Sequence, residues 1–135
     1  MTGHDRRADS VETYDPETAP DTAAWLALEE DERIRRIALY HRHVKAKLPN
    51  LQVHAALHAV VENQIAEELQ TVRETVARLQ AEGLSRHDAI HAVGSVLVGC
   101  LQALMREGAP ARFEVESYFQ DLRALTAGGW LKKGS

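Results

Sequence analysis

Apolar residues recur every three or four positions over most of this 135-residue chain, which is the period of an α-helix. No segment shows a convincing alternation of apolar and polar residues, which is the pattern of a half-buried strand. The pattern predicts an all-α fold, a compact bundle of four to five helices.

Two potential N-cap residues set the expected helix starts in the first half of the chain. Asp21 follows Pro20 and should begin a helix that ends near Lys47. Asn50 should begin the second helix.

The end of this second helix has two interpretations. Its apolar phase runs on to about Gln80, as in one long helix. Thr71 and Glu74, however, match a capping box, which marks a new helix start. The capping box favours a break between residues 67 and 70.

The third helix should start at Ser85 and end near Arg106, and a last helix is expected over residues 112–126. Apolar residues surround most of the third helix, so it should be central or covered by a second subunit. Ser95 and Gly99 are small and four residues apart, which would let another backbone approach closely. We therefore expect a homodimer that forms through this helix.

Composition sets the expected domain limits. Residues 1–20 are rich in acids and hold two prolines, so we expect a flexible acidic tail. Residues 21–127 should form a single helical domain, and residues 128–135 a loose C-terminal end.

Charge and cysteine content exclude several classes of protein. The net charge of −4 provides no global basic surface for nucleic acid or an anionic membrane. Residues 89–105 carry no formal charge but are slightly too short for a membrane span, which favours a buried helix. The single cysteine, Cys100, excludes an intramolecular disulfide and a cysteine-rich zinc site, and we expect a cytoplasmic protein.

Histidines form two rows with a spacing of four residues. Residues four apart on a helix are neighbours, so two imidazoles so placed can hold one metal ion. A further histidine lies in register with the apolar side of the first helix. The rows are His54, His58 and Glu62, then His87 and His91, and the further histidine is His41.

We assign the metal ligands from these rows. The predicted ligands are His58, Glu62, His87 and His91. The predicted second site or outer shell comprises His41, His54, Gln64 and Asp88, although Asp88 also suits the cap of its helix. In a rival set, His54 replaces Glu62, which then becomes a candidate general base.

Three interpretations of the rows remain open. A divalent cation would offset both the burial of imidazoles and their mutual repulsion. The others are a hydrogen-bonded polar core and a cluster at the surface or at an oligomer interface. Within one subunit the two rows can meet only if the second helix breaks near residues 67–70; otherwise a partner subunit must supply one of them.

The ligand types suggest zinc or iron, since imidazole suits both. The sequence therefore predicts a metal-binding helical bundle, with a small metal-dependent hydrolase or oxidoreductase as its candidate activity. The alternative is a non-enzymatic helical module for dimerisation or regulation, with a hydrogen-bonded histidine core.

The phrases "YHRH", "HAALHAVVENQIA" and "GLSRHDAIHAVGSVL" resemble an uncharacterised family of small bacterial helical proteins, a domain of unknown function. The resemblance covers residues 25–107. It implies that His41, the two rows and their glutamate form a recurring set, and it names no reaction.

Overall fold

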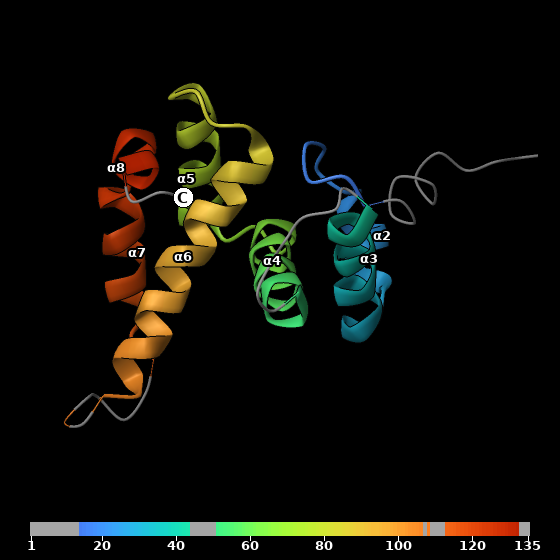
Figure 1. Cartoon of the computed structure of the whole chain (residues 1–135), viewed down its shortest axis with the longest axis horizontal. Coiled ribbons are helices and arrows are strands. Elements are labelled where there is room, and N and C mark those ends of the chain that lie inside the picture. Colours follow the sequence, from blue (N-terminus) through green and yellow to red (C-terminus); the bar gives the residue numbers. More distant parts are fainter. Residues whose placement is uncertain (1–13, 44–50, 107, 109–112, 133–135) are drawn as a thin grey trace, which may run out of the picture. The chain divides into compact units, whose positions relative to one another are not determined.

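The computed structural model describes residues 14–43, 51–106, 108 and 113–132, which fall into two units, 1–68 and 69–135. All regular structure in these residues is helical, which confirms the all-α class (Figure 1). Seven helices occur there, more than the four to five expected. They are α2 (Thr22–Ala27), α3 (Glu30–His43), α4 (Leu51–Ala66), α5 (Gln70–Ala81), α6 (Arg86–Leu104), α7 (Val115–Ala124) and α8 (Ala127–Lys132).

The first helix of unit 1 begins after Asp21 as expected, but the segment predicted as one helix forms two. Asp21 caps α2, with its side chain accepting a hydrogen bond from the Ala24 N–H at 3.0 Å. The single helix expected from Asp21 to Lys47 is wrong, because Leu28 is extended and α3 starts two residues later. Arg33 stabilises this break by donating to the carbonyl oxygens of Leu26 and Leu28. The expected helix end at Lys47 and the expected N-cap at Asn50 lie outside the described residues.

The predicted break after α4 is confirmed, but the predicted capping box of Thr71 and Glu74 is not its cause. Helix α4 ends at Ala66, and Glu68 adopts a left-handed conformation with φ of 61°. The N-cap of α5 is Leu69, which makes no side-chain capping bond. Thr71 lies inside α5, where its carbonyl accepts a bond from the Thr75 hydroxyl.

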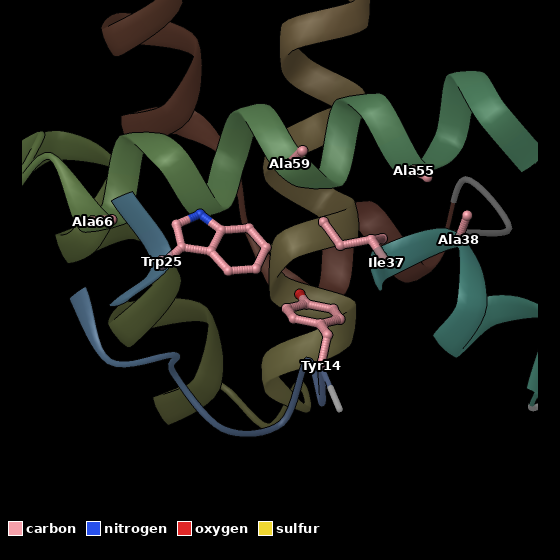
Figure 2. Close-up of a cluster of buried hydrophobic side chains, with 7 residues drawn as sticks. All are labelled: Tyr14, Trp25, Ile37, Ala38, Ala55, Ala59 and Ala66. Carbon is pink, nitrogen blue, oxygen red and sulfur yellow. The ribbon is translucent and has the colours of Figure 1, made fainter. Parts of the chain in front are cut away.

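The core of unit 1 joins α2, α3 and α4 through a few large rings and several alanines (Figure 2). Small side chains on α4 let the neighbouring helices approach its backbone closely. Residues 14–20 were expected to belong to the flexible tail, yet Tyr14 and Pro16 are buried here. The buried cluster comprises Tyr14, Trp25, Ile37, Ala38, Ala55, Ala59 and Ala66.

Unit 2 packs α5, α6 and α7 against one another (Figure 1). Gly83 ends α5 with φ of 111°, a conformation that glycine adopts without strain. Ser85 then caps α6 as predicted, accepting the Asp88 N–H at 3.1 Å. None of the described helices, α6 included, is long and apolar enough to cross a membrane.

The end of unit 2 contains a further helix. Where a loose end was expected, α8 forms and buries Trp130. Arg78 donates to the Leu122 carbonyl and pairs with Glu82, which accepts the Ala127 N–H at 2.8 Å. These bonds hold the junction of α7 and α8 against α5.

Unfolding in acid should reveal the Glu32 ion pairs at the start of α3. Hydrogen bonds from Arg35 and Arg36 lower the pKa of Glu32 from its usual 4.5 to about 2. The folded state therefore binds fewer protons than the unfolded state in this window, and the stabilising effect is complete above pH 4.5 and lost as the pH falls to about 2. In urea unfolding over this range, E32Q should show a shallower pH dependence than the wild type. E30Q, which changes an exposed residue of the same turn, should keep the wild-type slope.

Candidate metal centre

The two histidines of the first row lie side by side on α4 in unit 1, as the sequence predicts. His54 and His58 lie one turn apart, and their ring centroids are 4.5 Å from each other. Ala55 and Ala59 flank them on the same helix and are buried, so the helix next to them lies close. That helix is α3, which packs on α4.

Helix α3 brings a third imidazole to this row. The His41 ring centroid lies 4.6 Å from that of His54 and 4.8 Å from that of His58. His41, His54 and His58, here called the histidine trio, each offer one ring nitrogen, and these nitrogens lie within 4.8 Å of one another. Nitrogens bound to one tetrahedral zinc are separated by about 3.4 Å, since each Zn–N bond is about 2.0–2.1 Å. The spacing of the trio's nitrogens is therefore at most about 1.4 Å wider than the spacing around one zinc ion, which is compatible with metal binding.

The hydrogen bond of His41 selects the nitrogen that it can offer to a metal. The Ile37 carbonyl lies 2.8 Å from Nδ1 of His41 and can only accept, so Nδ1 carries the proton and donates. The lone pair then belongs to Nε2. An imidazole that donates its other N–H to a carbonyl is the usual arrangement of a metal ligand.

Burial favours in His41 the protonation state that metals require. His41 and His58 are 1% and 2% exposed, and His54 is half-buried. Burial lowers the pKa of His41, an effect that the bond to Ile37 only partly opposes. The neutral imidazole is therefore favoured, and it is the neutral form that binds a cation.

Glu62 ends the row of α4 and contacts a residue that we did not predict. Its carboxylate accepts a 2.6 Å hydrogen bond from the Tyr14 hydroxyl, and both side chains are buried. Tyr14 was overlooked because it lies in an acidic, proline-containing segment. The one sequence feature that could have indicated its burial is that it is an aromatic residue in a segment with few apolar residues.

Replacing Tyr14 with phenylalanine should destabilise the protein by about 1–3 kcal/mol, because it removes a donor from a buried carboxylate. The ring itself and its packing on Trp25 are retained in Y14F. Urea unfolding at neutral pH measures the change. E62Q and the double variant Y14F/E62Q complete a double-mutant cycle, and losses that simply add in the double variant would contradict the importance of the bond to Glu62.

Bonds from α2 and α3 fix α4 one residue beyond Glu62. The Asn63 side-chain oxygen accepts hydrogen bonds from Trp25 Nε1 and from Arg33, each at 3.0 Å. One amide on α4 thereby joins residues of both neighbouring helices. This arrangement limits the freedom of α4 next to the trio.

Unit 2 holds the second histidine row. His87 and His91 lie one turn apart on α6, with ring centroids 4.5 Å from each other, and both are half-buried. The backbone of Asp88 serves the cap of the same helix. Gln64, the other predicted outer-shell residue, is half-buried on α4 in unit 1.

Comparison with known proteins adds no further constraint on the site. No family model, no curated protein and no solved structure matches this chain.

Proposed function

We propose that this protein binds a divalent transition metal, zinc or iron, through the histidine trio of unit 1. The observation that carries the proposal is the convergence of three largely buried ring nitrogens from α3 and α4 within 4.8 Å of one another. Three imidazoles in one place would be costly as a purely structural device, since each needs its polar atoms satisfied and protonated rings so close together would repel one another. A bound cation would coordinate one nitrogen of each ring and would oppose the protonation of all three.

The donor set also suggests what chemistry the ion would supply. Three nitrogen ligands are the protein contribution in a common class of catalytic zinc site, which keeps one coordination position open. With zinc, such a site supports hydrolysis; with iron, it also supports oxidation and reduction. Glu62 ends the same row of α4, and it is the candidate acid–base group of the site if it does not itself bind the metal.

Elemental analysis of untagged protein, purified without added metal, tests the proposal. We expect close to one equivalent of zinc or iron for each chain. After chelation, the protein should take up cobalt(II) with the visible absorption of a site rich in nitrogen ligands. The metal should also raise the midpoint of thermal unfolding, because it binds only the folded chain. Protein that contains no metal and fails to take up cobalt would overturn the proposal.

The wider ligand set predicted from the sequence is tested by two further variants. His87 and His91 together offer two more nitrogens, and Glu62 offers a carboxylate. We propose these three residues as additional ligands. Metal content should fall in H87A/H91A and in E62Q, and variants that retain the full equivalent would limit the site to the trio.

A second candidate function is dimerisation through α6. Leu101 on α6 and Met105 immediately after it are 41% and 86% exposed, which is unusual for large apolar side chains that lie so close together. Light scattering in the presence of chelator tests this proposal. A dimer that dissociates on L101E/M105E substitution would support it, and a monomer at high concentration would exclude it.

A further inference from the structure

Unit 2 contains a cavity that the histidines do not explain. It has a volume of about 550 Å³ and lies between α6 and the segment formed by α7 and α8. This volume falls within the range of small-molecule sites, about 300–1,000 Å³. Its lining includes Gly99 and Cys100 from α6 and Trp130 from α8. Trp130 is the one of these three residues that is buried, at 7% exposed, and it lines the cavity from α8.

The charged side chains among the described lining residues of the cavity are all acidic. Glu114 and Asp121 both line it, and none of its described lining residues is a lysine, an arginine or a histidine. Aromatic rings lie in the same lining, from Phe113 and Trp130. Carboxylates together with aromatic faces are the combination that attracts an ammonium group, through charge and through cation–π interaction.

The cysteine in the lining does not suggest covalent chemistry. Burial and the neighbouring Asp121 raise the pKa of the Cys100 thiol. Its Sγ donates to the Asp121 carboxylate at 3.7 Å. The reactive thiolate is thus disfavoured, and the thiol acts as a neutral part of the wall.

We propose that this cavity binds an organic ammonium ion with an apolar body, its cationic head at Asp121 and Glu114 and its body against Trp130 and the apolar wall of α6. The site is formed by residues of unit 2 alone and is independent of the metal proposed for unit 1.

The test uses the two tryptophans as reporters. The chain contains only Trp25 and Trp130, which lie in different units, so an ¹H–¹⁵N spectrum shows two indole signals that a W130F variant assigns. The full-length protein is titrated with hexylammonium, and hexanoate and hexanol serve as probes of matched length. Hexylammonium should shift the Trp130 signal saturably and leave the Trp25 signal unchanged. The two matched probes should bind at least tenfold more weakly.

Three variants locate the binding site. D121N removes the charge of a carboxylate that lines the cavity and should weaken hexylammonium binding at least fivefold. Glu116 is an exposed carboxylate of the same helix that is not in the lining, so E116Q should change the affinity for hexylammonium less than twofold. G99L places a leucine side chain in the cavity and should weaken binding at least fivefold; a Cβ at Gly99 meets no atom within 4 Å, so the variant should still fold.

Several outcomes would overturn the proposal. Equal binding of hexanol or hexanoate would remove the role of charge. Unchanged affinity in D121N or G99L would place the ligand elsewhere. A Trp130 signal that moves with protein concentration, without any probe, would show that a second copy of the chain occupies this face.

Discussion

Alanine in place of His58 should remove the bound metal. His58 is 2% exposed, both of its ring nitrogens are buried, and it lies next to the other two histidines of the trio. Loss of a residue that only supports a ligand typically lowers metal affinity by about 10- to 100-fold, so loss of a ligand should lower it by more than about 100-fold. Competition with a chromophoric chelator measures the affinity, and elemental analysis of the purified variant should find the site nearly empty.

The controls for this experiment separate coordination from folding. H41A should reproduce the loss, because His41 reaches the same site from a different helix. H4A changes a histidine that is not part of the trio and should retain the full equivalent of metal. Circular dichroism should give the same helical content for H58A as for chelated wild-type protein. Metal retained in both H58A and H41A would show that the trio is not the site.

Local features of the fold were predictable because neighbouring residues determine them. Asp21 and Ser85 cap α2 and α6 as expected, because a side-chain oxygen at the start of a helix can accept a backbone N–H of the first turn that has no partner within the helix. The break after α4 was also expected, but its origin is the left-handed backbone of Glu68. A sequence gives no sign that a glutamate will adopt this conformation, which is uncommon for residues other than glycine.

Long-range contacts were less predictable. The period of α3 showed that His41 points inward, but not that it meets His54 and His58, because that contact depends on how α3 packs on α4. The interruption of the first helix depends on Arg33 contacting carbonyl groups five and seven residues earlier, which no local pattern shows.

The cavity of unit 2 was not predicted because α8 helps to form it. Gly128 and Gly129 made this segment look like a loose end, since glycine is unfavourable in a helix. Contacts outside the segment compensate for this. Trp130 is buried and Ala127 donates to Glu82, so tertiary contacts stabilise a helix of low intrinsic propensity.

Alanine in place of Trp25 should have the largest effect on folding. The indole is fully buried among the residues of the unit 1 core and packs against Tyr14 (Figure 2). Its N–H donates to the Asn63 side-chain oxygen. Removing a buried indole costs about 3–5 kcal/mol, through lost transfer free energy and the cavity that remains. Since small proteins are stable by only about 5–15 kcal/mol, W25A should have a much lower urea midpoint or be partly unfolded in buffer.

A matched variant separates packing from hydrogen bonding at this position. W25F keeps an aromatic ring in the core but removes the N–H that Asn63 accepts, and Asn63 retains its bond from Arg33. We therefore expect W25F to lose clearly less stability than W25A. If both variants lost the same free energy of unfolding, the bond to Asn63 rather than the bulk of the ring would hold α2 against α4. In that case N63A should cost as much as W25A, because it removes the acceptor that joins both neighbouring helices to α4.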